Sequence, residues 1–121
     1  MKDVNNNFLK EKQTLTKKEK LSKEEIRKLF REGKRIKVND YLGIYLYNQI
    51  PYAKIGFSTK KRMGNAVYRN YEKRIVKEIF RRSKQILPNV NLFILKTGKT
   101  STTFKHREDI LLRLFRQIRH V

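Results

Sequence analysis

The chain has 121 residues, and its 31 Lys and Arg residues outnumber 11 Asp and Glu residues to give a formal net charge of +20. This length suits a single domain, and seven Phe and six Tyr residues argue against a disordered chain. Such a charge favours a polyanionic partner, either nucleic acid or an anionic membrane surface.

Composition excludes several classes of protein. The absence of cysteine excludes disulfides and thiolate metal sites. No apolar run approaches the ~20 residues that a membrane-spanning helix needs, and the N-terminus has no secretory pattern. We therefore expect a cytoplasmic protein with no membrane partner.

The N-terminal part of the chain predicts an arm followed by a short helix. Residues 1–13 are polar and lack periodicity, so we expect a flexible basic arm, with residues 14–121 forming one domain. Ser22 and Glu25 form a capping-box pattern that opens a helix of about ten residues, and Gly33 is a suitable C-terminal stop. The apolar stripe of this helix is Ile26, Leu29 and Phe30.

Residues 41–47 alternate strictly and predict a strand with two different faces. One face is aliphatic, and we assign it to the core; it carries Leu42, Ile44 and Leu46. The other face carries Tyr41, Tyr45 and Tyr47, with a gap at Gly43. Such a face suits a stacking platform for single-stranded RNA, although aromatic residues on strands also pack for structural reasons.

The flanking segments predict further strands. Residues 34–40 form either a loop or an opening strand. Residues 53–59 form the next strand, and we expect it to pair with residues 41–47 as a hairpin. Residues 91–97 are apolar throughout, which is typical of a strand buried on both faces.

A long amphipathic helix separates the last two strands. Asn65 is a suitable N-cap, and the helical pattern runs from residue 66 to about residue 86. At 100° per residue, an arc of roughly 140° is almost wholly cationic. This arc contains Arg69, Asn70, Lys73, Arg74, Lys77 and Arg81. The apolar side contains Tyr68, Tyr71, Ile75, Val76 and Ile79, with Phe80 near the seam.

The cationic face has too few acids for an ordinary solvated helix. Arg69, Lys73, Lys77 and Arg81 are spaced at i, i+4, where like charges repel, and Glu78 is expected to pair with Arg82. A polyanion relieves this repulsion. Together with Lys60, Lys61 and Arg62 before the helix, the row predicts a nucleic-acid surface; a plain solvated surface is the alternative.

Thr103 is expected to cap a last helix. Its buried stripe is predicted to be Ile110, Leu111, Leu114, Phe115 and Ile118. Its outer face is predicted to carry Arg107, Arg113, Arg116 and Arg119.

The chain offers no arrangement of residues for catalysis. Asp occurs only at positions 3, 40 and 109, whereas a two-metal nuclease site needs several converging carboxylates. His106 and His120 have no further ligands near them in the sequence. Gly98-Lys99 is expected to be a turn, because Phe93 stands where a phosphate-binding loop needs glycine. We therefore expect no catalytic residue and no metal site in this chain.

The segment KKRMGNAVYRN, residues 60–70, followed by Lys73-Arg74, resembles the signature of the protein subunit of bacterial ribonuclease P. Tyr71 and Lys77 depart from the family pattern, which has arginine at both positions. Tyr71 loses a charge and can stack or pack, whereas Lys77 lacks the bidentate fork of arginine. The first helix, with Phe30 three residues before Gly33, also resembles the family, although relatives often have an aromatic residue in place of Ile26.

The resemblance implies an α+β fold, an α-β-β-β-α-β-α sandwich with a left-handed βαβ crossover and helices packed on a central sheet, as in domain 2 of ribosomal protein S5. It implies an endoribonuclease subunit that assists removal of the 5′ leader from precursor tRNA, with the chemistry carried by the RNA subunit. Mg²⁺ is then a cofactor bound mainly by that RNA. The expected partners are ribonuclease P RNA and precursor tRNA, with no protein partner required.

The resemblance also implies two sets of contact residues. Contacts with the catalytic RNA are expected from Lys60, Lys61, Arg62, Asn65, Arg69, Asn70, Lys73, Arg74, Lys77 and Arg81. Contacts with the leader are expected from Phe30, Tyr41, Tyr45 and Tyr47; for Phe30, a role in the core alone is the alternative.

Two other classes of function fit part of the sequence. A ribosomal protein or general RNA chaperone explains the size and charge but not the specific order of residues 60–70. A DNA-binding regulator would place the helix at residues 66–86 in a major groove, but such proteins have a short helix before the recognition helix, and here a strand precedes it.

Overall fold

The computed structural model describes residues 16–60, 64–98 and 102–120; the predicted arm at residues 1–13 lies outside them. The described helices are α2 (Lys23–Glu32), α3 (Ala66–Ser83) and α4 (Phe104–Gln117), with short 3-10 turns η1 (Lys17–Glu19) and η3 (Lys84–Ile86). The strands are β1 (Lys34–Val38), β2 (Tyr41–Tyr47), β3 (Lys54–Thr59) and β4 (Val90–Lys96). This order confirms the predicted α+β class.

The sheet has the strand order β1-β2-β4-β3, with only the β3–β4 pair parallel. The predicted hairpin between residues 41–47 and 53–59 is therefore wrong, because β4 lies between these two strands. A central place suits β4, in which Leu92 and Ile94 are fully buried and Phe93 is 6% exposed. The hairpin partner of β2 is β1, joined through Asn39, whose positive φ of 53° suits a tight turn.

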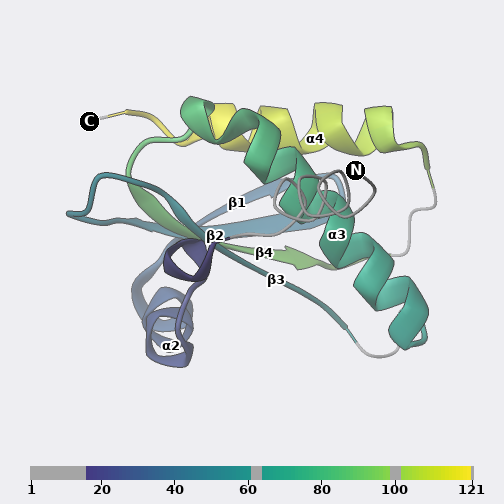
Figure 1. Cartoon of the computed structure of the whole chain (residues 1–121), viewed down its shortest axis with the longest axis horizontal. Coiled ribbons are helices and arrows are strands. Elements are labelled where there is room, and N and C mark those ends of the chain that lie inside the picture. The colour runs from purple at the N-terminus through teal and green to yellow at the C-terminus, as the bar shows by residue number, and fades with distance from the viewer. Residues whose placement is uncertain (1–15, 61–63, 99–101, 121) are drawn as a thin grey trace, which may run out of the picture.

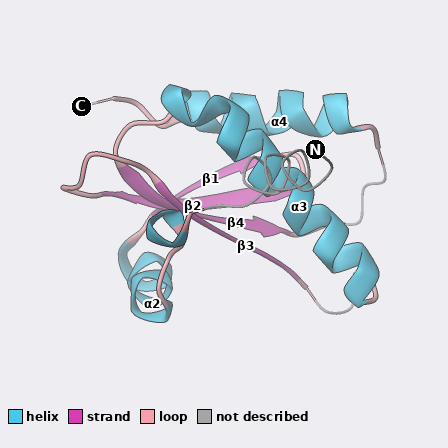
Figure 2. Cartoon of the chain, viewed as in Figure 1, coloured by secondary structure: helices cyan, strands magenta, loops and turns pink. Residues whose placement is uncertain are grey.

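Helices cover both faces of the sheet (Figures 1 and 2). On one face, α3 and α4 pack over the larger apolar cluster, to which Ile79 and Leu114 contribute. On the other face, α2 packs over a smaller cluster around Leu29, Ile44 and Phe93. The second face is only partly covered, because a single short helix lies across it.

The tyrosine face of β2 is in the larger cluster, which contradicts the predicted stacking platform. Tyr41 is 1% exposed and Tyr45 is 9% exposed. The gap at Gly43 is filled by α4, since a Cβ atom there would lie 2.9 Å from Leu114 Cδ2. Alternation distinguished the two faces correctly, but the aliphatic face turns to α2 and the tyrosine face turns to the main core.

Local signals positioned the helices as predicted. Ser22 Oγ accepts a hydrogen bond from the Glu25 amide at 3.1 Å, and the Glu25 carboxylate accepts one from the Ser22 amide at 2.8 Å. Thr103 Oγ1 accepts a hydrogen bond from the His106 amide at 3.1 Å. The predicted stripe of α4 is buried throughout, at Ile110, Leu111, Leu114, Phe115 and Ile118.

A buried ionic cluster connects α3, α4 and β4. Glu72 is 1% exposed, and its Oε1 accepts a hydrogen bond from Arg107 Nε at 3.0 Å. Lys96 Nζ lies 3.3 Å from the same oxygen and donates to the Tyr68 hydroxyl at 2.9 Å. Arg107 is 4% exposed, so its predicted place on the outer face is wrong. The remaining outer arginines are exposed as predicted: Arg113, Arg116 and Arg119.

We expect Glu72→Gln to lower the free energy of unfolding by about 3 kcal/mol or more, because it leaves the buried cations Arg107 and Lys96 without that carboxylate. Glu78→Gln is a matched control on the same helix, since Glu78 is partly exposed and its one ion pair among the described residues is with Arg81, and it should cost about 1 kcal/mol or less. Chemical denaturation of both variants checks this. Equal, small losses would show that the buried cluster does not hold α3 in place.

Candidate nucleic-acid interface

The start of α3 is built by the residues of the basic motif. Asn65 is the N-cap, and its side-chain oxygen accepts a hydrogen bond from the Tyr68 amide at 2.9 Å. Lys60 is exposed just before the helix, whereas Lys61 and Arg62 lie outside the described residues. The cap thus orients the first turn, and an RNA phosphate at this end would meet free amide groups and a favourable helix dipole.

Most of the predicted cations on α3 have no acidic partner in the described part of the chain. Lys73 and Arg74 are exposed, and Arg69 and Lys77 are partly buried. Arg69 Nε is buried and has no hydrogen-bond partner among the described residues. Because like charges along one helix repel, this face keeps an uncompensated charge that a polyanion can neutralise.

Acidic residues at the C-terminal end of α3 pair differently from the prediction. Glu78 forms its ion pair with Arg81 at 2.5 Å and not with Arg82. Arg82 instead lies 3.4 Å from Glu108 of α4. Arg81 is therefore the one predicted RNA contact on α3 that has an acidic partner within residues 64–98 and 102–120.

Two aromatic residues of α3 also differ from their predicted places. The helical pattern predicts Tyr71 on the apolar side, but Tyr71 is 48% exposed. The same pattern predicts Phe80 near the seam, but Phe80 is fully buried in the main core. The buried arc of α3 is therefore rotated relative to the predicted one. It includes Glu72 and Phe80 and leaves out Tyr71.

A groove lies between α3 and the segment that leads into α2. Its volume is about 200 Å³, and β3 and β4 form its floor. Three lysines reach it from two sides: Lys20, Lys73 and Lys77. The other lining residues are Leu21, Ile26, Ile55, Gly56, Phe57, Val76 and Phe93. No described residue that lines the groove is acidic, so it combines an apolar floor with a cationic rim.

The groove's outer wall is held against β3. Lys20 bridges to Ile55 in parallel register, and the Leu21 amide donates a hydrogen bond to the Ile55 carbonyl at 3.4 Å. Lys54 Nζ, at the start of β3, lies 2.8 Å from a Glu25 carboxylate oxygen of α2. These contacts fix the distance between α2 and the edge of the sheet, and with it the width of the groove.

Lys77 is a partly buried cation of the groove. Burial, and then the nearby charges of Lys73 and Lys20, lower the pKa of Lys77 from its usual value of 10.5. The charged form of Lys77 is therefore destabilised in the folded protein, and a phosphate bound beside it would stabilise that form.

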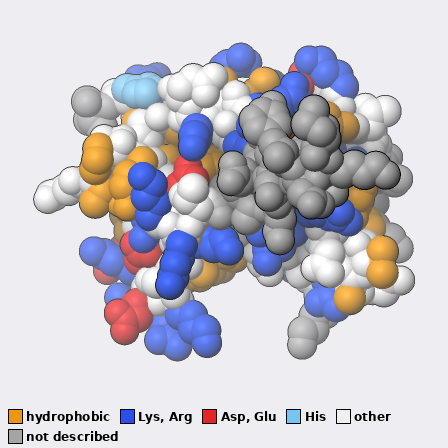
Figure 3. Space-filling view, viewed as in Figure 1, with side chains coloured by type: hydrophobic (Ala, Val, Ile, Leu, Met, Phe, Trp, Pro, Cys, Tyr) orange, Lys and Arg blue, Asp and Glu red, His pale blue; other side chains and the backbone are white. Residues whose placement is uncertain are grey.

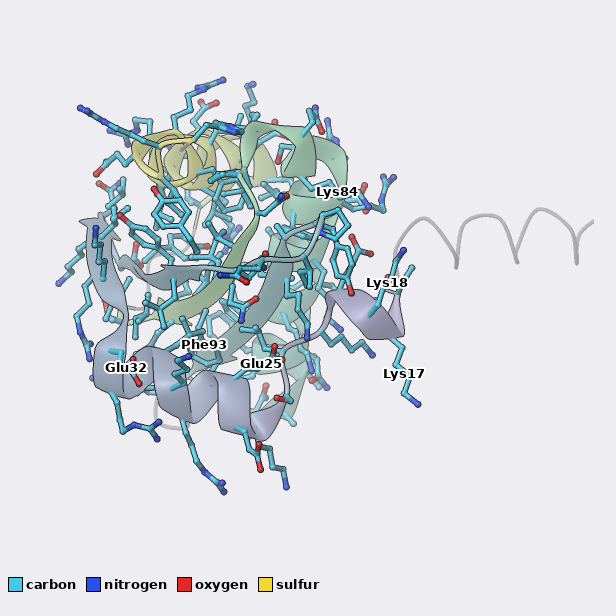
Figure 4. All side chains as sticks on the ribbon, turned by 90° about the vertical axis from the view of Figure 1, so that its left-hand side faces the viewer. Lys17, Lys18, Glu25, Glu32, Lys84 and Phe93 are labelled. Carbon is cyan, nitrogen blue, oxygen red and sulfur yellow. The ribbon has the colours of Figure 1, made fainter. Side chains whose placement is uncertain are left out.

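The predicted leader contacts do not lie together. Phe30 of α2 is 43% exposed, and its ring centroid lies 5.4 Å from that of Phe93, which lines the groove. Figure 4 shows Phe93 between the sheet and α2. Tyr41 and Tyr45 are buried on the opposite face of the sheet. Tyr47 is 39% exposed, but its hydroxyl donates to the Arg119 carbonyl near the end of α4.

Sequence reasoning identified only Lys73 and Lys77 among the residues that line the groove, and it missed Phe93 and Lys20 in particular. Phe93 lies within a strand that is apolar throughout, so no local pattern distinguishes its groove-facing ring. Lys20 lies two residues before the Ser22 cap in a segment with many lysines. Its role follows only from the bridge to β3, which joins residues far apart in the sequence.

Other site types find little support in the described ranges. Residues 16–60, 64–98 and 102–120 contain no group of three or more His, Cys, Asp or Glu side chains that could hold a metal ion. His120 Nε2 lies 2.8 Å from the Ile86 carbonyl. None of the described helices combines the length and the apolarity needed to cross a membrane.

The space-filling view shows Lys and Arg side chains spread over one face, with few acidic ones (Figure 3).

The fold and this interface define a small, strongly basic α+β protein with a cationic helix beside an open groove. The model of the Ribonuclease P family matches residues 15–119. The chain therefore belongs to the Ribonuclease P protein family.

Individual relatives agree with this assignment. The Ribonuclease P protein component of Thermotoga maritima is 32% identical over 78 residues, which cover 64% of this chain and 67% of that protein. The one from Alkaliphilus metalliredigens is 30% identical over 99 residues, covering 79% and 88%. A solved structure of the T. maritima RNase P protein has a TM-score of 0.78 at 28% identity and covers 84% of this chain and 98% of that one.

We expect Lys77→Met to stabilise the fold while weakening RNA binding. Because the pKa of Lys77 is lowered in the folded protein, the unfolded chain binds more protons between that pKa and 10.5, and stability rises with pH across this window. Removing the charge should raise the unfolding free energy at pH 7 and reduce that alkaline rise. Denaturation at several pH values and titration with a single-stranded RNA check both effects.

Lys28→Met is the matched control for stability, because Lys28 is an exposed residue of α2 and loses the same charge. A Lys77→Met protein that is less stable than the parent and binds RNA equally well would identify Lys77 as a structural residue only.

Proposed function

We propose that this chain is the protein subunit of ribonuclease P, which binds the catalytic RNA and the 5′ leader of precursor tRNA during leader removal. One observation carries the proposal: the acid-free groove lies directly beside a helix on which four cations have no acidic partner within the described residues, namely Arg69, Lys73, Arg74 and Lys77. A polyanion can occupy both places at once, and two RNA segments can be held side by side across α3.

The catalytic RNA is proposed to lie on the exposed face of α3. Arg69, Asn70 and Arg74 are on this face, and the Asn65 cap and Lys60 extend it beyond the N-terminus of the helix. Arg69 is partly exposed, and its guanidinium group can donate two parallel hydrogen bonds to a phosphate. Contacts of this kind position RNA without reading its sequence.

The leader is proposed to lie in the groove as a single strand. Lys20, Lys73 and Lys77 would contact its phosphates, and the apolar floor around Phe93 would contact its bases. Phe30 extends this floor through its contact with Phe93. Tyr41 and Tyr45 have no part in this arrangement, because they are buried beneath α3 and α4.

The chemistry is proposed to be carried by the RNA subunit. The described side chains do not provide the clustered carboxylates of a two-metal nuclease, so they do not fit a resident Mg²⁺ site, and Mg²⁺ would be bound mainly by RNA. The protein's contribution is positive charge, which offsets repulsion between the two RNA molecules in the cytoplasm. No second protein is needed for this role.

Reconstitution tests the proposal directly. We would follow leader cleavage of a precursor tRNA at low Mg²⁺ concentration in four samples: a bacterial ribonuclease P RNA with this protein, the RNA without protein, the RNA with an unrelated basic protein of equal charge, and this protein without RNA. Cleavage should require the RNA. Of the two proteins, only this one should restore cleavage by the RNA. Equal restoration by the unrelated protein would favour a general RNA chaperone, and cleavage by the protein without RNA would refute the assignment of chemistry.

We expect a Lys73→Gln/Lys77→Gln variant to bind precursor tRNA more weakly in the holoenzyme while affinity for mature tRNA stays unchanged, since only the precursor has a leader. Each lost phosphate contact should reduce the slope of log affinity against log salt by about 0.7. Arg113→Gln/Arg116→Gln removes equal charge from the exposed face of α4 and should leave the preference for the precursor intact. An equal effect of the two variants on both tRNAs would contradict a leader site in the groove.

A further inference from the structure

A second cavity lies on the other flank of α3, away from the groove. It has a volume of about 300 Å³ and is lined by Tyr71, Arg74, Ile75 and Glu78 of α3 and by Phe104 at the start of α4. This volume is at the lower end of the range for small-molecule sites. The cavity thus offers aromatic walls in a protein that otherwise presents mainly cations.

Arginines hold both aromatic rings of this cavity in place. The Arg107 guanidinium lies 5.8 Å from the Tyr71 ring centroid, and Arg107 is itself fixed by Glu72 at 3.0 Å. The Arg82 guanidinium lies 5.5 Å from the Phe104 ring centroid. Tyr71 nevertheless remains 48% exposed. An aromatic ring that is supported on one side and open on the other is pre-organised for stacking.

Charge at the rim indicates what can enter. Arg74 is exposed and forms no ion pair or hydrogen bond within the described residues. Glu78 lines the same cavity, but its carboxylate is paired with Arg81 at 2.5 Å. A free cation beside an open aromatic ring matches a nucleotide, whose phosphate needs a cation and whose base needs a flat apolar partner.

We propose that this cavity takes one unpaired nucleobase of the catalytic RNA, stacked on Tyr71 with Arg74 at its phosphate. The inference rests on the proposed function, in which that RNA lies along the exposed face of α3. The leader is less suited to this place, because the groove and the cavity are lined by different residues on opposite flanks of the helix. The site would add base stacking to an interface otherwise made of phosphate contacts.

A tryptophan at position 71 provides a direct probe, because the chain contains no tryptophan. We would titrate Tyr71→Trp with a bacterial ribonuclease P RNA, with an RNA duplex, and with a single-stranded leader oligonucleotide. The catalytic RNA should quench the indole fluorescence strongly, since a stacked base contacts the ring. The duplex and the leader oligonucleotide should quench it little at matched degrees of binding.

Affinity of the substituted proteins provides the second measurement. Tyr71→Ala and Tyr71→Leu should weaken binding of the catalytic RNA about tenfold, whereas Tyr71→Phe should change it little because stacking needs only the ring. The slope of log affinity against log salt should be unchanged in all three, since no phosphate contact is lost. Val67→Ala is the matched control, because Val67 is an apolar residue of α3 that is 76% exposed and lies outside the cavity lining.

The outcomes separate this inference from the proposed function. If the parent protein binds the catalytic RNA no better than other structured RNAs, the proposed function fails. If binding is specific but Tyr71→Leu binds as tightly as the parent and Tyr71→Trp is not quenched, the nucleobase site is refuted while the function stands. Quenching by the leader oligonucleotide alone would refute the assignment to the catalytic RNA, and thermal unfolding of each variant separates lost binding from lost folding.

Discussion

The position of α3 depends on the carboxylate of Glu72. This side chain is buried at the junction of α3, α4 and β4, where Arg107 and Lys96 compensate its charge. A buried charge is tolerated only with such partners, so α3 can rotate or slide little without separating them. Because the helix is held on this side, its opposite side can carry cations that repel one another.

One helix therefore serves two surfaces. Its flank toward β3 forms the groove with Lys73 and Lys77, and its flank toward α4 forms the aromatic cavity with Tyr71 and Arg74. On the outer arc between these flanks, Asn70 is exposed and Arg81 is partly buried. Arg107 connects the packing to the surface, because it both binds Glu72 and supports the Tyr71 ring, so stability and the geometry of the cavity are linked through one side chain.

Features with short-range causes could be predicted from the sequence. Caps at Ser22 and Thr103 and the stripe of α4 depend on neighbours within a few residues.

The place of β4 between β2 and β3 could not be predicted, because pairing preferences are similar for several apolar strands. Alternation separated the two faces of β2 but could not say which one α4 would cover; Leu114 packing against Gly43 decides that. The Glu72–Arg107 pair joins residues 35 positions apart. The sequence therefore could not show that Glu72 of α3 and Arg107 of α4 are buried together. Of the candidate site, the cationic row of α3 was predictable because it lies on one helix, whereas the groove is formed jointly by α2 and the segment before it, β3, α3 and β4.

The arrangement of the sheet has a consequence for the protein without its RNA. β1 is an edge strand, and it exposes Lys34, Arg35 and Lys37 along its length. Open edges can join with those of other molecules, and lysine-rich edges resist this by electrostatic repulsion. The positive charge thus also keeps copies of the chain apart. Polyanions that neutralise it without covering β1 would remove this protection, so self-association should be greatest when the protein is in excess over a short, non-specific RNA.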